Sequence, residues 1–375
     1  MKVGCPKEIK AQEFRVGLTP AAVNELVRHG HFVTIETNAG QGAGFVDSDY
    51  EKEGADIVGS AKEVFDKADM IVKVKEPQAI ERKMLKSGQL LFTYLHLAPD
   101  PEQTHDLIDS GCTAIAYETV TDLNGGLPLL APMSEVAGRL APQMGAWTLQ
   151  KANGGRGVLL GGVPGVAPAK VLVLGGGVVG TNAARVAAGM GADVTVLDKS
   201  LSRLRYIDDV FGHLFKNGYA SQKATAELAS QADLIIGAVL VAGAEAPKLI
   251  SKEQLSTLQT GTDLVDVAID QGGCFETSRA TTHADPIYEI DGIMHYCVAN
   301  MPGAVARTST LALGNATLPF IISLADKGWI KACSDNPNLF NGLNVHDGKL
   351  TYSAVGEALG IETVKPDLKA LSILH

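Results

Sequence analysis

Several kinds of protein are excluded by what this chain of 375 residues has little of. Aromatic residues make up 5% and charged residues 20%, whereas 46% of the residues are hydrophobic, a balance typical of globular proteins with large buried sheets and not of disordered ones. The formal net charge is −10 and no basic stripe occurs in the sequence. Nucleic acids and anionic membrane surfaces are therefore not expected partners.

Cysteine, signal sequences and metal-ligand patterns are scarce as well. The five cysteines are scattered without C-x-x-C spacing, which indicates free thiols in a reducing cytoplasm. The first residues, MKVGCPKEIK, contain no apolar run of the signal-peptide kind. The nearly uncharged stretch 158–180 is interrupted by Lys170 and two prolines, which argues against a membrane span. Histidine and carboxylate spacing indicates no metal site.

The segment 170–198 is the most informative part of the chain. A run of β-favouring residues precedes Gly175, Gly177 and Gly180, which have G-x-G-x-x-G spacing and are followed by an alanine-rich helical segment. A second strand-like run ends at Asp198, 21 positions after Gly177 (198 − 177). This context predicts a dinucleotide-binding unit, with the pyrophosphate at the helix N-terminus and Asp198 on the adenosine ribose. A tight turn without a ligand is the simpler alternative.

The length of the chain predicts about two domains, and strands alternate with helices along it. The expected strands are 2–5, 33–36, 70–74, 90–95, 114–117, 171–174, 193–197, 234–240, 264–268 and 294–299. The expected helices are 20–29 with Thr19 as cap, 61–67, 81–84, 101–109, 134–152, 182–190 and 304–325, and the last fifty residues are expected to be short and helical. The predicted fold is α/β, with two doubly wound parallel-sheet (Rossmann-like) domains and a cleft between them.

The domain division follows from the long helix after the last strand, which would return the chain to its first domain. We predict a discontinuous substrate or catalytic domain, 1–128 and 307–375, and an inserted dinucleotide-binding domain, 129–306. The first domain has no glycine fingerprint, so its sheet is expected to hold something other than the dinucleotide.

Four polar residues stand at predicted strand ends, where open parallel sheets bind their ligands. Lys75 follows the strand 70–74, His96 follows the strand 90–95, and Asp270 follows the strand 264–268. Arg15 lies in the loop after the first strand. A guanidinium can hold a carboxylate through two hydrogen bonds, and a histidine can transfer a proton near neutral pH. Together these side chains favour the oxidation of a small 2-amino or 2-hydroxy acid.

Each of these residues also has a plainer explanation. Lys75 could be a solvated strand end like Lys73, and His96 could be a structural histidine. Arg15 could be a surface cation, and Asp270 could form a turn. Their common position at strand ends is what favours the site.

Longer motifs give the chain a resemblance to a known family. They are Gly4–Pro20 (GCPKEIKAQEFRVGLTP), Val72–Pro77 (VKVKEP), Phe92–His96 (FTYLH), Gly175–Ala184 (GGGVVGTNAA), Asp266–Gly273 (DVAIDQGG) and Val298–Gly303 (VANMPG). Together they resemble alanine dehydrogenases and pyridine-nucleotide transhydrogenases over nearly the whole chain. Gln12 departs from the pattern, because the family usually has Asn there, and little functional effect is expected.

The resemblance implies an NAD-dependent L-alanine dehydrogenase that is a cytoplasmic homohexamer acting on L-alanine, pyruvate and ammonium. It implies that Arg15 and Lys75 bind the substrate and that His96 and Asp270 are the acid and base. It implies cofactor contacts, beyond Gly175, Gly177, Gly180 and Asp198, from Ser134, Val178, Val179, Arg203, Ala220, Val239, Leu240, Val267, Ala268, Ile269, Asp270, Arg279, Val298, Ala299, Asn300 and Met301.

Two other functions stay open at this point. One is the soluble nucleotide-binding module of a proton-translocating transhydrogenase, which would need no amino-acid site. The other is a saccharopine-forming dehydrogenase, which would need a long pocket for lysine. The cofactor is open in one respect too. Asp198 should repel the 2′-phosphate of NADP, but Lys199, Arg203 and Arg205 follow closely and could weaken that preference.

Overall fold

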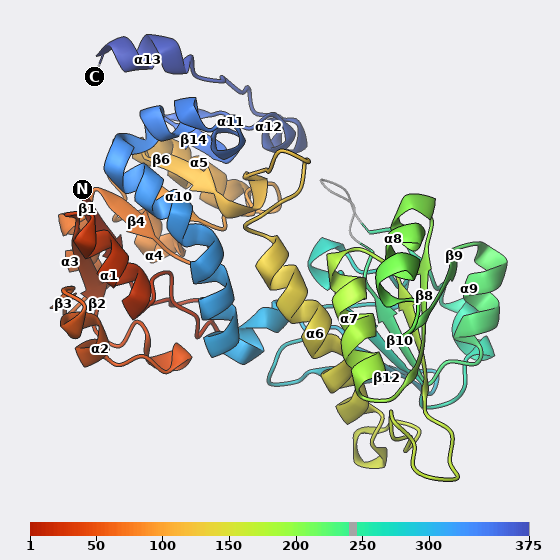
Figure 1. Cartoon of the computed structure of the whole chain (residues 1–375). Helices are drawn as coiled ribbons and strands as arrows, with labels where there is room; N and C mark the ends of the chain where they lie inside the picture. The colour runs from red at the N-terminus through yellow and green to blue at the C-terminus, as the bar shows by residue number, and fades with distance from the viewer. Residues whose placement is uncertain (240–245, 375) are drawn as a thin grey trace. The chain divides into compact units, whose positions relative to one another are not determined.

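The structure, a computed structural model, describes residues 1–239 and 246–374 of the chain (Figure 1). The chain forms two compact units. The first unit, here the outer-chain unit, consists of Met1–Met133 and the segment that begins at Val305. The second, the inserted unit, is Ser134–Ala304.

The outer-chain unit contains a sheet of eight strands in the order β15-β14-β6-β5-β4-β1-β2-β3. The strands are β1 Lys2–Cys5, β2 Phe32–Glu36, β3 Asp56–Val58, β4 Met70–Val72, β5 Leu90–Thr93, β6 Thr113–Ala116, β14 Leu343–His346 and β15 Lys349–Leu350. All neighbours from β3 to β6 are parallel, whereas β14 is antiparallel to β6 and to β15. The carboxyl ends of β1, β4, β5 and β6 therefore lie at one edge.

Helices surround this sheet. They are α1 Pro20–Arg28, α2 Asp47–Lys52, α3 Ala61–Lys67, α4 Ala79–Arg82, α5 Pro101–Ser110, α10 Ala306–Asp335, α11 Pro337–Phe340, α12 Ser353–Leu359 and α13 Leu368–Leu374. Thr19 caps α1 by accepting a hydrogen bond from the Ala22 N–H at 3.1 Å, and Pro20 occupies the first turn, as expected from the sequence. Ser60 and Asp100 cap α3 and α5 in the same manner.

The inserted unit contains a seven-stranded sheet in the order β12-β13-β11-β10-β7-β8-β9. Its strands are β7 Lys170–Leu174, β8 Asp193–Asp198, β9 Lys216–Tyr219, β10 Leu234–Gly237, β11 Asp263–Asp266, β12 Ile287–Ile290 and β13 Ile293–Tyr296. Its helices are α7 Val178–Gly189, α8 Leu201–Phe211 and α9 Gln222–Ala229, and α6 Ala131–Thr148 leads into the unit. Only β12 among these strands is antiparallel to its neighbour.

Both parallel sheets have doubly wound topology, and the prediction of this fold class is confirmed. In the inserted unit, the strand order reverses direction between β7 and β10, and in the outer-chain unit it reverses between β1 and β4. Ligands of such sheets bind outside the carboxyl ends of the strands near this switch point. The topology therefore gives each unit one edge where a ligand site is expected.

Several expectations about single elements were wrong. The last fifty residues are not only helical, because β14 and β15 extend the first sheet. The short strands β3 and β12 were not expected. The helix predicted from 134 begins instead at Ala131, so Ser134 lies within α6. The helix expected to end at 325 continues to Asp335, past a break at Gly328 whose φ is 71°.

Helix α10 and the segment before it are unusually apolar. Across the described residues, Met301–Asp335 is the one helical stretch long and apolar enough to cross a membrane, with a mean hydropathy of 1.3. Within the structure 39% of its most apolar window is buried, and α10 packs on α1 and α11 of its own unit. One such helix is weak evidence for a membrane span, since the core helix of a globular protein has the same composition.

Candidate functional site

The glycine-rich turn between β7 and α7 has the geometry that its spacing predicts. Gly175 has a φ of 101°, which a residue with a side chain rarely adopts. A Cβ atom at Gly180 would lie 1.7 Å from the Gly175 carbonyl oxygen, so only glycine lets α7 approach the strand this closely. A Cβ atom at Gly177 would meet nothing within 4 Å. The turn is thus closed behind Gly180 and open at Gly177, where backbone N–H groups begin a helix and can receive a phosphate.

Two charged side chains hold this turn from the side of β8. Asp198, the last residue of β8, accepts hydrogen bonds from the N–H groups of Gly176 and Ser200, both at 2.7 Å. The Arg203 guanidinium donates to the Gly176 carbonyl and to Thr181 Oγ1, the latter at 2.7 Å. Both residues were singled out in the sequence as ligand contacts, and both also support the turn itself.

The other predicted cofactor residues lie mostly just beyond strand ends on the same edge of the sheet. Because β7, β8, β9, β10, β11 and β13 are parallel, their carboxyl ends meet along one edge. The residues at or just after these ends are Gly175, Gly177, Val178, Val179, Asp198, Ala220, Val239, Val267, Ala268, Ile269, Asp270, Val298, Ala299, Asn300 and Met301. Leu240 lies outside the described residues.

Ser134 and Arg279 are placed differently from the rest of that set. Ser134 lies in α6. The Arg279 backbone N–H donates to the Tyr288 hydroxyl at 2.8 Å, and its guanidinium carbon lies 3.9 Å from the centre of the Tyr288 ring. Neither residue follows a parallel strand, so the topology alone does not assign them to the cofactor edge.

Asp270 is exposed in a short 3₁₀ turn after β11. The turn is anchored by Asp266, a buried carboxylate that the sequence reading did not single out. It accepts hydrogen bonds from the N–H groups of Ala268 and Cys274 at 3.1 and 2.7 Å and from Ser278 Oγ at 2.5 Å. Burial raises the Asp266 pKa, and these hydrogen bonds oppose that shift. Asp266 thereby fixes the backbone that presents Asp270.

In the outer-chain unit, Arg15 is buried against Glu13. Its Nε and Nη2 atoms donate to the two Glu13 carboxylate oxygens at 2.7 and 2.6 Å, and only 2% of the residue is exposed. Burial acts to lower the Arg15 pKa, but the hydrogen bonds and charge of Glu13 raise it above its usual value. Arg15 therefore stays charged and is not the surface cation of the plainer explanation. Glu13 occupies the Nε–Nη2 edge of the guanidinium, and Nη1 donates to Met133 Sδ at 3.1 Å.

His96 follows β5 with a backbone φ of 49°, an uncommon value for a residue with a side chain. The Glu118 carboxylate stabilises this conformation, because it accepts hydrogen bonds from the N–H groups of Leu95 and His96 at 3.1 and 2.6 Å. The His96 ring stacks on Tyr94 with 5.8 Å between ring centres and is 44% exposed. The imidazole thus faces solvent from a strained strand end, which suits a proton-transferring group better than a structural one.

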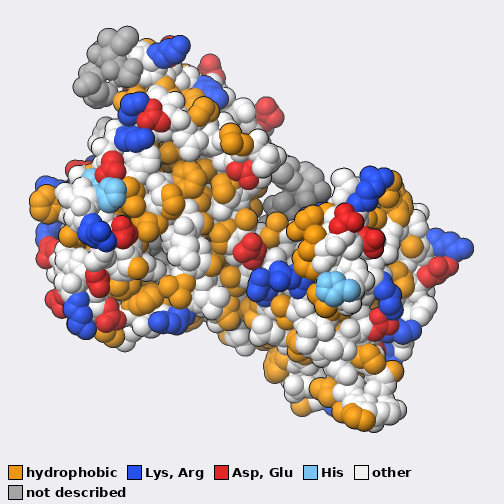
Figure 2. All heavy atoms as spheres, in the orientation of Figure 1, with side chains coloured by type: hydrophobic (Ala, Val, Ile, Leu, Met, Phe, Trp, Pro, Cys, Tyr) orange, Lys and Arg blue, Asp and Glu red, His pale blue; other side chains and the backbone are white. Residues whose placement is uncertain are grey.

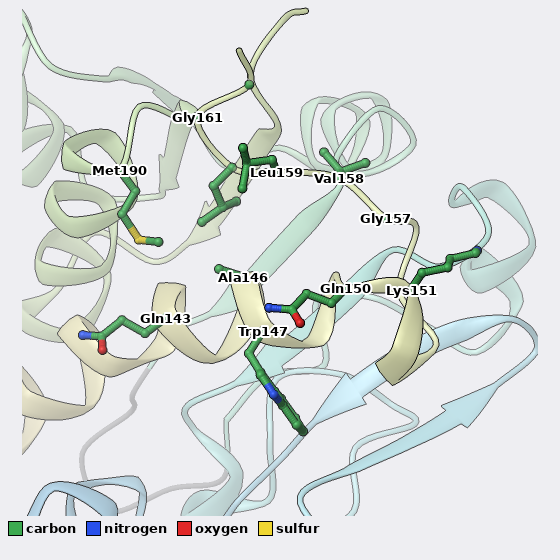
Figure 3. Close-up of a pocket in the computed structure, with 12 residues that line it drawn as sticks. Gln143, Ala146, Trp147, Gln150, Lys151, Gly157, Val158, Leu159, Gly161 and Met190 are labelled. Atoms are coloured by element: carbon green, nitrogen blue, oxygen red, sulfur yellow. The ribbon is translucent and has the colours of Figure 1, made fainter.

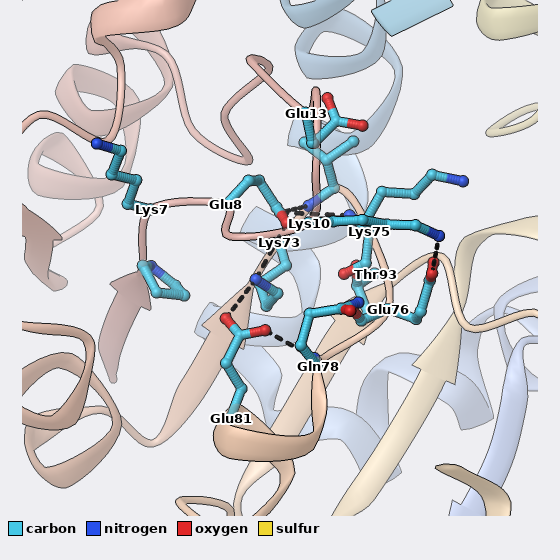
Figure 4. A network of polar contacts seen from close by, with 12 residues as sticks. Lys7, Glu8, Lys10, Glu13, Lys73, Lys75, Glu76, Gln78, Glu81 and Thr93 are labelled. Atoms are coloured by element: carbon cyan, nitrogen blue, oxygen red, sulfur yellow. Dashed lines mark hydrogen bonds and ion pairs between the residues drawn. The ribbon is translucent and has the colours of Figure 1, made fainter. Parts of the chain in front are cut away.

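Lys75 and Lys73 differ, although they stand two residues apart. Lys73 is fully buried between two carboxylates, with its Nζ 3.1 Å from Glu8 and 2.6 Å from Glu81 (Figure 4). Burial acts to lower its pKa, and the two carboxylates raise it. The comparison of Lys75 with a solvated Lys73 was therefore wrong. Lys75 itself is partly exposed beyond the end of β4.

Arg15, Lys75 and His96 share the carboxyl edge of the first sheet. The Arg15 loop passes close to the end of β4, because a Cβ atom at Gly17 would lie 2.8 Å from the Val72 carbonyl oxygen. Thr93, the last residue of β5, donates from its hydroxyl to the Lys75 carbonyl at 3.0 Å. The edge therefore carries two cations and one imidazole, a set suited to a small 2-oxo or 2-amino acid.

Comparison with known proteins agrees with both units. Residues 4–137 match the family "Alanine dehydrogenase/PNT, N-terminal domain", and residues 141–353 match "Alanine dehydrogenase/PNT, C-terminal domain". The chain is 60% identical to the alanine dehydrogenase of Halomonas elongata over 365 residues, covering 97% of this chain and 98% of the relative. It is 53% identical to that of Bacillus subtilis over 372 residues, covering 99% and 98%.

The chain belongs to the alanine dehydrogenase/PNT family. A solved L-alanine dehydrogenase superimposes with a TM-score of 0.93 at 51% identity and covers 96% of this chain and 99% of its own. A transhydrogenase from Sinorhizobium meliloti shares the fold, with a TM-score of 0.81 at 24% identity over 94% of this chain and 100% of its own. The expected family and the expected enzyme class, an oxidoreductase, are confirmed.

Gln12 departs from the family motif, and the structure gives the departure a physical meaning. Gln12 has a φ of 59° in the loop that carries Glu13 and Arg15. Asn adopts this left-handed conformation more readily than Gln, because its short side chain hydrogen-bonds locally. The loop of this member of the alanine dehydrogenase/PNT family is therefore slightly strained at that residue.

A hollow in the inserted unit lies away from the predicted cofactor edge. It has a volume of about 670 Å³ and lies between the end of α6, the loop 157–162 and Met190 (Figure 3). Met190 follows α7, whose 12 residues begin at the glycine turn, so a helix of about 18 Å separates the hollow from that turn. Among residues 1–239 and 246–374, no group of three or more His, Cys, Asp or Glu side chains could hold a metal ion.

Proposed function

We propose that the chain catalyses the reversible oxidative deamination of L-alanine to pyruvate and ammonium, with NAD as the hydride acceptor. The observation that carries the proposal is the charged edge of the outer-chain unit, where Arg15, Lys75 and His96 follow neighbouring strands. Relatives named alanine dehydrogenase, at 52–60% identity over nearly the full length, support the same reaction.

The dinucleotide-binding domain predicted at 129–306, which contains the inserted unit, is proposed to hold NAD. The open backbone at Gly177 fits a pyrophosphate, and Asp198 at the end of β8 fits the ribose hydroxyls. When bound there, the nicotinamide would accept a hydride from the α-carbon of the substrate. The outer-chain residues 1–128 and 307–375 are proposed to bind that substrate.

Arg15 and Lys75 are proposed to bind the carboxylate and the carbonyl oxygen of the substrate. Arg15 is held in one orientation by Glu13, so it would bind a substrate carboxylate with little loss of side-chain entropy. Lys75 adds a second positive charge at the same strand edge. Two cations suit pyruvate, whose carboxylate and adjacent carbonyl both carry partial or full negative charge.

His96 and Asp270 are proposed to move protons at the substrate carbon that changes bonding. In the direction of deamination, they would remove a proton from the water that adds to the imine carbon and then help the carbinolamine to release ammonium. In the reverse direction, protonated His96 would polarise the carbonyl oxygen of pyruvate. The exposed imidazole of His96 is consistent with exchange of that proton with solvent.

An assay of NAD reduction with L-alanine tests the function directly. Turnover with L-alanine, and none with lysine plus 2-oxoglutarate, is expected. A transhydrogenase module would reduce no NAD with L-alanine, and a saccharopine-type enzyme would prefer the lysine pair. Lack of L-alanine turnover in the folded, NADH-binding protein would contradict the proposal.

Replacement of His96 by Ala tests the proton-transfer role. We expect turnover to fall about 100-fold or more, because general acid–base catalysis contributes factors of this order. The NADH dissociation constant, measured by fluorescence, should stay unchanged, because His96 belongs to the other unit. Near-normal turnover in this variant would remove His96 from the mechanism.

We also propose that NAD is preferred over NADP, that the protein is a hexamer, and that it resides in the cytoplasm. The Asp198 carboxylate supports the first proposal, since it would repel a 2′-phosphate. Exposed apolar side chains of the inserted unit support self-association, namely Trp147, Leu159, Val163, Val166 and Met190. Comparing the two cofactors in one assay tests the first proposal, and measuring the mass by light scattering tests the second. On the face seen in Figure 2, acidic and basic side chains are interspersed.

A further inference from the structure

The backbone that carries Lys75 is held by a buried carboxylate. Glu8 Oε1 accepts hydrogen bonds from the N–H groups of Val74 and Lys75, at 2.7 and 3.3 Å. Both N–H groups lie beyond the last residue of β4. Glu8 comes from the loop after β1, so a residue far away in sequence fixes the direction in which the chain leaves β4.

The second carboxylate oxygen of Glu8 is held by an ion pair. Glu8 Oε2 contacts Lys73 Nζ at 3.1 Å, and Lys73 also contacts Glu81 Oε1 at 2.6 Å. Glu81 in turn accepts from the Gln78 backbone N–H at 2.8 Å, so α4 begins on this network (Figure 4). Lys73 and Glu81 are fully buried and Glu8 is 6% exposed. Charged side chains at such depth have strongly restricted geometry, because any departure leaves an unpaired charge in a low-dielectric interior.

The carbonyl group of Lys75 is fixed as well. It accepts a hydrogen bond from Thr93 Oγ1 at 3.0 Å, and Thr93 belongs to the neighbouring strand β5. Lys75 is thus anchored through its N–H by Glu8 and through its carbonyl by Thr93, while its side chain remains partly exposed. Such a backbone clamp sets the direction of the Cα–Cβ bond, and with it the region that the ammonium group can reach.

We propose that Glu8 is a positioning residue, which directs Lys75 toward the carboxylate or carbonyl oxygen of a small 2-oxo acid, and that Lys73 and Glu81 hold Glu8 in place. The inference rests on the proposed function, since it needs Lys75 to contact the substrate. Glu8 does not itself act as an acid or base on the substrate, because it is buried and both of its oxygens are engaged by Lys73 and the backbone.

Two replacements of similar size separate the acceptor role of Glu8 from its charge. Glu8→Gln and Glu8→Met remove the same negative charge, but only Gln keeps an oxygen for the Val74 and Lys75 N–H groups. The measurement is the dissociation constant of pyruvate from the enzyme–NADH complex without ammonium, by isothermal titration calorimetry. We expect Glu8→Met to weaken pyruvate binding about 10-fold, the usual effect of losing a buried acceptor, and Glu8→Gln to weaken it less than about 3-fold.

A double-variant cycle tests whether Glu8 acts through Lys75. Lys75→Ala alone should weaken pyruvate binding about 10-fold or more, and adding Glu8→Met should change it by less than about 2-fold further. Multiplied losses in the double variant would overturn the inference, as would equal losses in the Gln and Met variants. If Glu8→Met does not fold, Glu8→Asp serves in its place. Asp keeps the negative charge, but its side chain is one methylene shorter, so its oxygens lie farther from the Val74 and Lys75 N–H groups. This variant should also weaken pyruvate binding.

Arg82→Met is the control for loss of a buried charge near this network, because Arg82, the last residue of α4, is buried like Glu8 and Lys73. It pairs with Glu102 and Asp106, at 2.9 and 2.6 Å, and its backbone contact is with the Pro77 carbonyl, not with Lys75. This variant should lower the thermal midpoint while leaving the pyruvate dissociation constant unchanged. A weakened pyruvate affinity in Arg82→Met would assign the Glu8 effect to general loss of stability and overturn the inference. Absence of L-alanine turnover in the unaltered enzyme would instead contradict the proposed function.

Discussion

The two units prepare the carboxyl edges of similar sheets by opposite means. In the inserted unit, glycines leave the backbone of the turn after β7 accessible to a ligand, and few charged side chains are buried. The outer-chain unit uses enclosed charge, with Glu8, Lys73, Glu81, Glu13 and Arg15 all buried beneath its edge. The difference follows from the ligands we propose, since a pyrophosphate can be bound by backbone N–H groups, whereas a small acid needs cations held in fixed positions.

The comparison also explains why a sequence motif predicts the cofactor edge of the inserted unit, whereas no motif predicts the buried charges of the outer-chain unit. Space around a backbone requires glycine at fixed spacing, which is visible along the chain. A network of buried charges requires only that distant residues meet. Four predictions, in order of decreasing effect, test whether the two edges really depend on these different features.

The largest effect is expected in the inserted unit at Gly180. Gly180→Ala would place a Cβ atom 1.7 Å from the Gly175 carbonyl oxygen, so α7 must move away from β7. We expect a loss of more than about 3 kcal/mol of unfolding free energy, as for other severe steric substitutions, together with loss of NADH binding. The thermal midpoint and NADH fluorescence measure the two effects.

Gly177→Ala is the matched control for that change. Its Cβ atom would meet no protein atom within 4 Å, so the thermal midpoint should be unchanged. NADH affinity should nevertheless fall about 10-fold, because the methyl group enters the space through which a pyrophosphate would approach the backbone. Full NADH affinity in Gly177→Ala would show that the ligand does not approach the turn from its open side.

The next largest effect is expected in the outer-chain unit at Lys73. Lys73→Met leaves Glu8 and Glu81 facing each other without a cation, which should lower the unfolding free energy by about 3–5 kcal/mol. Adding Glu81→Met should recover part of this loss, because one of the two unpaired charges is removed. Urea unfolding followed by circular dichroism measures both variants. If the double variant is no more stable than the single one, the effect of Lys73 is packing and not charge.

A buried histidine of the inserted unit should give that unit a pH dependence. His295 lies between Thr277 Oγ1 and the Ile293 carbonyl at 2.7 and 3.0 Å, and burial lowers its pKa to about 4. The unfolded chain takes up a proton below about pH 6.5 whereas the folded one does not until about pH 4, so stability falls as pH drops through this window, by about 3 kcal/mol in total. The thermal midpoint of His295→Gln should depend less steeply on pH between 6.5 and 4. An unchanged slope would mean that His295 titrates normally in the folded state.

The smallest effect is expected at Gln12. Gln12→Asn should raise the unfolding free energy by about 0.5 kcal/mol, because Asn tolerates the left-handed conformation better. Asn38, which has a φ of 60°, offers the reverse experiment, and Asn38→Gln should lower stability by a similar amount. Thermal midpoints measured side by side would resolve changes of this size. A destabilised Gln12→Asn variant would show that the Gln side chain makes a contact worth more than the strain.

The alternation of strand and helix and the glycine spacing were sufficient to predict both parallel sheets, because the signals are local. The strands β14 and β15 were missed because each is short and depends on its partner for stability. β14 pairs with β6, more than two hundred residues earlier in the chain, and no local pattern records such a pairing. Strand ends were predicted to within a few residues, which was enough to place Lys75, His96 and Asp270 beyond them.

What the sequence did not reveal was the supporting layer beneath the site residues. Lys73 was interpreted as solvated, although its position between Val72 and Val74 in an apolar run was a sign of burial. Asp266, at the end of the apolar run that forms β11, was likewise in a position that indicates burial. Glu118 could not be connected with His96 from sequence, because the strained backbone that it stabilises is visible only in three dimensions.

The insertion of one unit within the sequence of the other affects the order in which the two units can fold during translation. The inserted unit is one continuous stretch, Ser134–Ala304, and can fold as soon as it has been synthesised. The outer-chain unit can assemble the strands from β3 to β6 early, but β6 stays an open sheet edge until β14 emerges at the end of translation. An unpaired edge is a site of aggregation. Nascent chains that stall before residue 343 are therefore the ones expected to need a chaperone.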